Sequence, residues 1–204
     1  MDTTLIPINH PEAMSIALEV LNHGGLVAFP TDTVYGLGGS VFNGSAIDGI
    51  YQAKNRPREK SIPILIGDID DLVKVSGDVP EIALKLAARF WPGPLTLVIP
   101  KRPDLPKQVS STESVGVRMP DYLMARILLR LAGPMAVTSA NLSGQASPST
   151  AEEVWGQLSG RIDLILDGGK TLGGVPSTVV DCLGPELIVL RQGPITQDEI
   201  LAID

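Results

Sequence analysis

The sequence predicts an α/β fold in which helices flank a sheet of mixed parallel and antiparallel strands. Short apolar runs that are typical of buried strands alternate with helix-period segments through the first two thirds of the chain, and strand-like runs dominate the rest. With 204 residues, of which 44% are hydrophobic, the chain is long enough to bury a core. Residues 1–204 are therefore expected to form a single domain.

Hydrophobic period and turn residues locate the elements in order. The first helix starts at Pro11, carries apolar residues at i, i+3 and i+4 spacing, and ends at Gly24-Gly25. Further helices are expected at 45–53, from Asp68 to 75, from Pro80 to 90, from Asp121 with apolar positions Leu123, Ile127, Leu128 and Leu131, and from Thr150 to 158. Strands are expected at 26–29, 62–66, 95–99, 115–118, 135–138, 164–166, 178–182 and 187–190. The glycine-rich stretch 35–44 and the proline- and serine-rich stretch 101–114 are expected to be loops.

Composition excludes several classes of protein. A net charge of −7 with only 4% aromatic residues argues against non-specific binding to nucleic acid or to an anionic membrane. No apolar run is long enough to span a membrane, and the N-terminus carries no basic and apolar leader, so a cytoplasmic protein is expected. The one cysteine, Cys182, excludes an internal disulfide and a cysteine zinc cage, and it is expected to be a buried strand residue. The two histidines, His10 and His23, flank the first helix and are poorly placed for serine or cysteine catalysis.

Two stretches imitate nucleotide-binding motifs but fail the full pattern. Gly169-Lys170-Thr171 resembles the end of a phosphate loop, but Leu164 stands where its first glycine is required. Gly36-Leu37-Gly38 lacks the third glycine of a dinucleotide fingerprint, because that position is Val41.

A basic cluster at 54–60 is the strongest signal in the residues themselves. Lys54, Arg56, Arg58 and Lys60 stand against one acid, Glu59, in a chain that is acidic as a whole. Fixed cations of this kind can bind a polyanion such as a triphosphate, often together with Mg²⁺. A solvated surface turn is the alternative.

Polar residues follow several of the expected strands. They are Thr31-Asp32-Thr33, Arg118, Ser139-Ala140-Asn141, Ser177-Thr178 and Arg191. Because open α/β sheets bind ligands at the carboxyl ends of their strands, these residues are expected to converge there with the basic cluster. The alternatives are structural ion pairs for the arginines and self-bonded turns or caps for the hydroxyl and amide groups.

Six separated motifs, in order from about residue 6 to residue 194, together resemble the YrdC-type family of threonylcarbamoyl-AMP synthases. They are Pro30-Thr31-Asp32-Thr33-Val34-Tyr35-Gly36-Leu37-Gly38, Lys54-Asn55-Arg56-Pro57, Trp91-Pro92-Gly93-Pro94-Leu95-Thr96, Val117-Arg118-Met119-Pro120, Ser139-Ala140-Asn141 and Arg191-Gln192-Gly193-Pro194. The resemblance implies an open, twisted sheet with a concave basic face.

The resemblance also implies a reaction. L-threonine, bicarbonate and ATP, with Mg²⁺, would give threonylcarbamoyl-AMP and pyrophosphate. Downstream transfer proteins would then use the adenylate to modify an adenosine in transfer RNA, and a direct contact with transfer RNA is an alternative role for the basic face. This chemistry needs charge neutralisation and positioning more than a side-chain base, and the catalytic residue that takes the proton of the threonine amine is left unassigned.

Site residues are carried over from the family at matching positions. Thr31, Arg118 and Ser177 match positions that hold threonine, and the arginine suits its carboxylate as a bidentate partner. The nucleotide contacts are matched by Lys54, Arg56, Arg58, Ser114, Ser139, Asn141, Ser147 and Arg191.

Three departures from the family pattern are visible. Leu65 stands where some members carry histidine, and Asp32 where glutamate is common. The chain ends soon after Arg191-Gln192-Gly193-Pro194, so it resembles the short form without an additional C-terminal domain. Two alternatives stay open: an RNA-binding module of the same fold, and a sister protein with another carbamoyl-type substrate.

Overall fold

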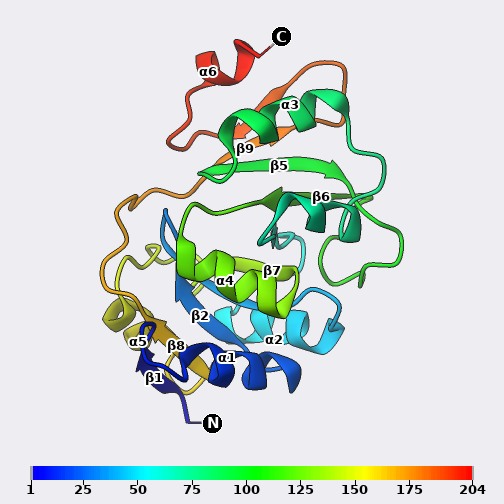
Figure 1. The fold of residues 1–204 in the computed structure, drawn as a ribbon. Coiled ribbons are helices and arrows are strands. Elements are labelled where there is room, and N and C mark those ends of the chain that lie inside the picture. The colour runs from blue at the N-terminus through cyan, green and yellow to red at the C-terminus, as the bar shows by residue number, and fades with distance from the viewer. Residues whose placement is uncertain (1, 204) are drawn as a thin grey trace.

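The apolar runs assemble into one sheet of ten strands within residues 2–203, the part of the chain that this computed structural model describes (Figure 1). The strands are β1 (Thr4–Pro7), β2 (Val27–Pro30), β3 (Tyr35–Ser40), β4 (Ile64–Leu65), β5 (Leu95–Pro100), β6 (Ser114–Arg118), β7 (Met135–Ser139), β8 (Leu164–Asp167), β9 (Thr178–Asp181) and β10 (Ile188–Arg191). Their order across the sheet is β1-β8-β2-β3-β7-β4-β6-β5-β9-β10.

The sheet is mixed, as the sequence predicts. The pairs β1/β8, β2/β8, β4/β6 and β5/β9 are parallel. The pairs β2/β3, β3/β7, β4/β7, β5/β6 and β9/β10 are antiparallel. Both edges of the sheet therefore come from the two ends of the chain, with β1 at one edge and β10 at the other.

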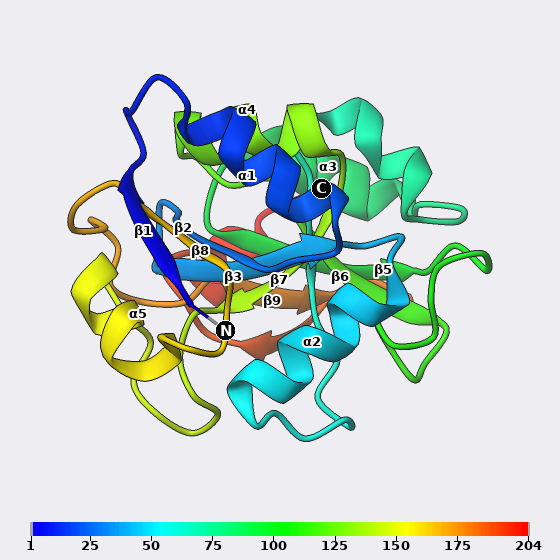
Figure 2. The ribbon, with the colours of Figure 1, turned by 90° about the horizontal axis from the view of Figure 1, so that it is seen from below.

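Helices cover the two faces of the sheet. They are α1 (Ala13–Asn22), α2 (Gly44–Lys54), the 3₁₀ helix η1 (Ile69–Lys74), α3 (Glu81–Phe90), α4 (Leu123–Ala132), α5 (Ala151–Leu158) and α6 (Gln197–Leu201). Figure 2 shows α1 and α4 on one face and α2 and α5 on the other, and the buried side chains of α3 belong to the same apolar cluster as those of α2 and α5. Thr150 caps α5 by accepting a hydrogen bond from the Glu153 backbone N–H, as its sequence predicts.

The expectation of a glycine-rich loop at 35–44 is wrong for its first half. Residues 35–40 form β3, a central strand that pairs with β2 and β7. Its glycines allow β7 to pack closely against it. A Cβ on Gly36 would lie 2.8 Å from Val137 Cγ1, and one on Gly38 would lie 2.8 Å from Val137 Cγ2. Close packing of β7 on β3, and not conformational freedom, explains the glycines here.

The buried face of α4 also differs from expectation. Leu123 and Leu131 are 67% and 56% exposed, and the buried positions are Ala125, Leu128 and Leu129. The face turned inward contains the small residue Ala125, and α1 packs beside α4 in the same apolar cluster. Periodicity located the helix, but the packing partner decided which apolar stripe is buried.

Three elements of the structure are not predicted by the sequence, and two others differ in length or type. The strands β1 and β3 and the helix α6 have no counterpart in the expected elements, and β4 is shorter than the expected strand at 62–66. The helix capped by Asp68 is of the 3₁₀ type. The stretch 101–114 is a loop, as expected, apart from an isolated bridge between Ser76 and Lys101 and the first residue of β6.

Candidate active site

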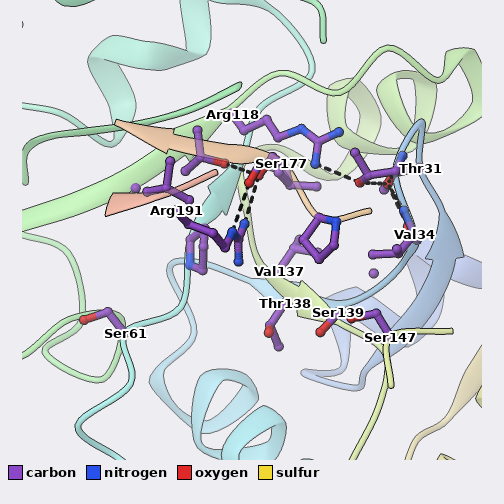
Figure 3. A pocket seen from close by; sticks show the side chains of 18 of the residues that line it. Thr31, Val34, Ser61, Arg118, Val137, Thr138, Ser139, Ser147, Ser177 and Arg191 are labelled. Carbon is purple, nitrogen blue, oxygen red and sulfur yellow. Dashed lines mark hydrogen bonds between the residues drawn. The ribbon is translucent and has the colours of Figure 1, made fainter. Parts of the chain in front are cut away.

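A cavity of about 380 Å³ lies on the sheet (Figure 3). Seven strands contribute to it, namely β3, β4, β5, β6, β7, β9 and β10, together with the turn after β2, Arg56, Ser147 and the segments 61–63 and 176–177. Its wall is formed by Thr31, Thr33, Val34, Tyr35, Gly36, Arg56, Ser61, Pro63, Leu65, Thr96, Val98, Gly116, Arg118, Val137, Thr138, Ser139, Ser147, Pro176, Ser177, Val179 and Arg191. Three arginines and a set of hydroxyls thus face an otherwise apolar hollow.

The site residues do not meet at one carboxyl-terminal edge, so that expectation is wrong. Leu65 of β4 pairs with Arg118, the last residue of β6, and with Met135, the first residue of β7. Arg118 and Ser139 therefore leave strands of opposite direction at opposite ends, and Ser177 precedes β9. Because the sheet is mixed, these residues reach the cavity across the face of the sheet.

Arg118 is the most constrained cation of the wall. Its side chain is 7% exposed and forms an ion pair with Asp32. Its Nε donates to the Gly93 carbonyl at 3.0 Å and its Nη1 to Thr33 Oγ1 at 3.0 Å. Burial raises the pKa of the Asp32 carboxyl, an effect larger than the opposing attraction of the guanidinium. Asp32 is not a wall residue, so its carboxylate holds the arginine from outside the cavity.

The hydroxyl of Thr31 is engaged in its own turn. It donates to the Val34 carbonyl at 2.7 Å and accepts from the backbone N–H groups of Thr33 and Val34 at 3.2 and 3.3 Å. It also lies 3.0 Å from Thr33 Oγ1. Thr31 is a wall residue, as the prediction requires, but its oxygen primarily shapes the turn between β2 and β3.

A second arginine is fixed to the residue before β9. Arg191 donates from Nε to the Ser177 carbonyl at 3.0 Å and from Nη2 to Ser177 Oγ at 3.2 Å. The Ser177 hydroxyl also lies 2.8 Å from Thr96 Oγ1 of β5. Figure 3 shows Arg191, Ser177 and Arg118 on one side of the cavity, opposite Thr138, Ser139 and Ser147.

The basic cluster at 54–60 divides between the cavity and the outer surface. Arg56 is a wall residue and donates to the carbonyls of Lys60 and Ser61 at 3.0 and 2.8 Å. Arg58 instead forms an ion pair with Asp48 of α2, with its side chain 56% exposed. The structure therefore brings Arg56 to the site and leaves Arg58 outside the wall.

Lys54 is buried beneath the site. It is 1% exposed, and its ammonium donates to the carbonyls of Ser139 and Asn141. Burial, with the nearby Arg56 guanidinium, lowers the pKa of Lys54 to about 7. Asn141 donates to the carbonyls of Leu142 and Gln145 at 2.8 and 2.9 Å. Both residues therefore support the turn that carries Ser139, and neither belongs to the wall.

Ser114 and Ser147 occupy different places. Ser147 is a wall residue. Ser114 is not, but a chain of hydroxyls at 3.0–3.1 Å spacing links it through Thr112 and Ser110 to Ser61 at the wall. This chain fixes the loop 108–114 beside the cavity.

Sequence reasoning missed several wall residues. The cavity is also lined by Thr96 and Val98 of β5, Val137 of β7 and Val179 of β9. These residues belong to apolar runs for which the sequence predicts only strands. The alternation of faces along a strand would have separated them from Leu97 and Val180, which are buried in the core. Leu65 also lines the cavity, so its apolar side chain faces any bound substrate.

The loop 168–176 lies against the Thr31–Val34 turn. Gly174 N–H donates to the Thr33 carbonyl at 2.8 Å, and Tyr35 Oη donates to the Gly169 carbonyl at 2.7 Å. A Cβ on Gly173 would lie 2.5 Å from the Asp32 carbonyl oxygen, so only glycine fits there. The loop leads into Pro176 and Ser177 of the wall.

The structure also bears on metal-ligating groups, on the thiol and on membrane-spanning helices. Among residues 2–203 no cluster of His, Cys, Asp and Glu is suited to hold a metal ion. Cys182 is buried, as expected, and burial raises its pKa to about 12. In the same range, no helix has the length and apolarity needed to cross a membrane.

A family model described as "Telomere recombination", and named for Sua5, YciO and YrdC, matches residues 19–193. The chain belongs to the Sua5/YciO/YrdC family. This confirms the family that the six motifs indicate.

Relatives within the Sua5/YciO/YrdC family carry more specific names. A threonylcarbamoyl-AMP synthase of Bacillus subtilis is 44% identical over 98% of this chain and 59% of its own length. A Mycobacterium tuberculosis protein named putative threonylcarbamoyl-AMP synthase is 38% identical, over 92% of this chain and 88% of its own. The solved structure of P. abyssi Sua5 complexed with L-threonine has a TM-score of 0.95 at 39% identity, covering 98% of this chain and 61% of that one. The first of these relatives and the solved Sua5 are thus considerably longer than this chain.

Proposed function

We propose that this chain catalyses the formation of threonylcarbamoyl-AMP and pyrophosphate from L-threonine, bicarbonate and ATP. The observation that supports it is the convergence of Arg56, Arg118 and Arg191 on one cavity of a chain whose relatives are named as such synthases. ATP and bicarbonate are anions and threonine carries a carboxylate, so a wall with three guanidinium groups suits this set of substrates.

Each arginine has a part in the proposed reaction. Arg118 would take the threonine carboxylate, beside the hydroxyls of Ser177 and Thr96. Arg56 and Arg191 would face the phosphates, with Ser139 and Ser147 on the opposite side. We retain Lys54 and Asn141 as supports of the Ser139 turn, in addition to the nucleotide contacts predicted for them.

The chemistry requires positioning more than a side-chain base. The threonine nitrogen would form a bond to the bicarbonate carbon with loss of water, and an oxygen of the resulting carbamate would attack the α-phosphorus. The bond between the α-phosphorus and its bridging oxygen would break, and pyrophosphate would leave. The described wall contains no carboxylate, imidazole or thiol, so neutralisation of phosphate charge by fixed guanidinium groups is its main contribution.

Magnesium would enter with the nucleotide. The described wall presents no carboxylate to serve as a ligand, and Mg²⁺ commonly binds through substrate phosphates and water. We therefore propose MgATP as the substrate and no resident metal. The adenylate would pass to proteins that transfer the threonylcarbamoyl group to transfer RNA.

The test is pyrophosphate release by the purified protein with MgATP, omitting threonine or bicarbonate in turn, with mass spectrometry of the product. Release that requires both substrates, together with threonylcarbamoyl-AMP in the products, supports the proposal. Arg191→Gln should lose most of this activity, whereas Arg102→Gln, at an exposed pair with Asp104, should retain it. Transfer RNA binding without any pyrophosphate release would overturn the proposal in favour of the RNA-binding alternative.

A further inference from the structure

Thr33 joins Arg118 to the turn between β2 and β3. Its Oγ1 accepts from Arg118 Nη1 at 3.0 Å and lies 3.0 Å from Thr31 Oγ1. The side chain is buried, at 2% exposure, and belongs to the cavity wall. Neither the composition nor the family motifs assigned it a role of its own.

The donors and acceptors of this group can be counted. Thr31 Oγ1 donates to the Val34 carbonyl at 2.7 Å and accepts from the backbone N–H groups of Thr33 and Val34. Thr33 Oγ1 accepts from the guanidinium at 3.0 Å and lies 3.0 Å from Thr31 Oγ1. Thr33 therefore links Arg118 to a turn that is itself held by hydrogen bonds.

The same accounting applies to Arg118. A guanidinium has five N–H donors, and three of them are used by Gly93, Thr33 and Asp32. These three partners come from two turns that are far apart in sequence, so they fix the plane of the guanidinium. Two N–H groups, one on each terminal nitrogen, have no hydrogen-bond partner among residues 2–203.

We infer that Thr33 is a positioning residue, which orients Arg118 so that its two remaining N–H groups hold the carboxylate of the amino-acid substrate. This inference rests on the proposed function for the identity of the substrate. The geometry of a planar fork decides whether two hydrogen bonds to a carboxylate form together. Loss of the Thr33 hydroxyl would release one side of the fork.

The first test is steady-state kinetics of Thr33→Val, which keeps the shape and removes the hydroxyl. The KM for threonine should rise about tenfold, while kcat and the KM for ATP stay nearly unchanged, because the carboxylate is held equally before and during reaction. Thr33→Ser restores the hydroxyl and should restore the KM. A merely structural role would instead lower the melting temperature and kcat without raising the KM for threonine.

The second test separates action through Arg118 from direct contact with the substrate. In an Arg118→Lys background, Thr33→Val should change the KM for threonine less than twofold, because the group it positions is gone. Independent effects that multiply would overturn the inference. Thr196→Val, which removes the cap of α6, is the matched control and should lower the melting temperature with no change in the KM.

A third measurement does not depend on turnover. Rotation of the Arg118 guanidinium, followed by ¹⁵N NMR of its Nη groups, should be slow in the wild type and faster in Thr33→Val. If the wild type makes no adenylate but this difference is seen, the proposed function fails and the positioning stands. If the wild type is active and neither rotation nor KM changes, the positioning is refuted and the function stands.

Discussion

Replacement of Gly36 by alanine tests how closely β7 packs on β3. The new Cβ would lie 2.8 Å from Val137 Cγ1, whereas its next contacts, the carbonyl oxygens of Thr138 and Phe29, are at 3.8 and 3.9 Å. A single methyl group of Val137 therefore causes the conflict. The backbone of Gly36 does not have a left-handed φ, so alanine is allowed there apart from this contact.

Two opposing effects set the magnitude. Overpacking of a core by one methyl group typically costs about 1–3 kcal/mol. Loss of glycine's freedom in the unfolded chain recovers about 0.5–1 kcal/mol. We expect Gly36→Ala to lower the free energy of unfolding by about 0–2.5 kcal/mol. In a chain of this length, that corresponds to a melting temperature lower by at most roughly 10 °C.

The decisive measurement is whether Gly36→Ala raises or lowers the free energy of unfolding, first in the wild type and then in Val137→Ala. Val137→Ala removes the obstructing methyl groups, so Gly36→Ala in that background should stabilise the protein by about 0.5–1 kcal/mol. Gly156→Ala, in helix α5 with no atom within 4 Å of the new Cβ, is the matched control. It should stabilise the wild type by about 0.5–1 kcal/mol through helix propensity.

Urea denaturation of four proteins, namely the wild type, Gly36→Ala, Val137→Ala and the double variant, gives the free energies of unfolding that complete this cycle. A stabilising Gly36→Ala in the wild-type background would refute the close packing of β3 and β7. Equal effects in both backgrounds would show that Val137 is not the obstacle.

Three further predictions concern the buried lysine, the thiol and the basic cluster. The pKa of Lys54 is lowered from its ordinary value of 10.5 to about 7 in the folded protein. Between pH 7 and pH 10.5 the unfolded chain therefore binds more protons at this residue than the folded chain does. Lys54 should therefore add a contribution to the free energy of unfolding that rises with pH across this window. Urea denaturation as a function of pH should show this rise in the wild type and in Lys60→Met, which changes an exposed lysine, but not in Lys54→Met. Cys182, with its pKa raised to about 12, should not react with a thiol reagent at pH 8 until urea unfolds the protein; prompt reaction would contradict its burial. Arg56→Ala should raise the KM for ATP at least about tenfold and Arg58→Ala less than about threefold, as only the former lies at the cavity; equal effects would contradict this division.

Local signals in the sequence determined much of the fold. The capping residue Thr150, the apolar period of the first helix and the strand-like runs from 95 to 99 and from 135 to 138 are properties of neighbouring residues, and these elements are found. The mixed character of the sheet followed from their order along the chain. The six separated motifs also sufficed to identify the family.

Tertiary structure decided what depends on partners distant in sequence. The strand β3 was missed because its glycines are explained by Val137 of another strand, about one hundred residues away along the chain. Lys54 and Arg56 are equivalent as charges in the sequence, yet one is buried against two carbonyls and the other faces the cavity. Likewise Arg118 and Ser139 end strands of opposite direction, and only pairing with β4 brings them to one wall. Sequence period specifies which face a residue occupies on its own element, whereas its neighbours across the sheet are set by register and packing.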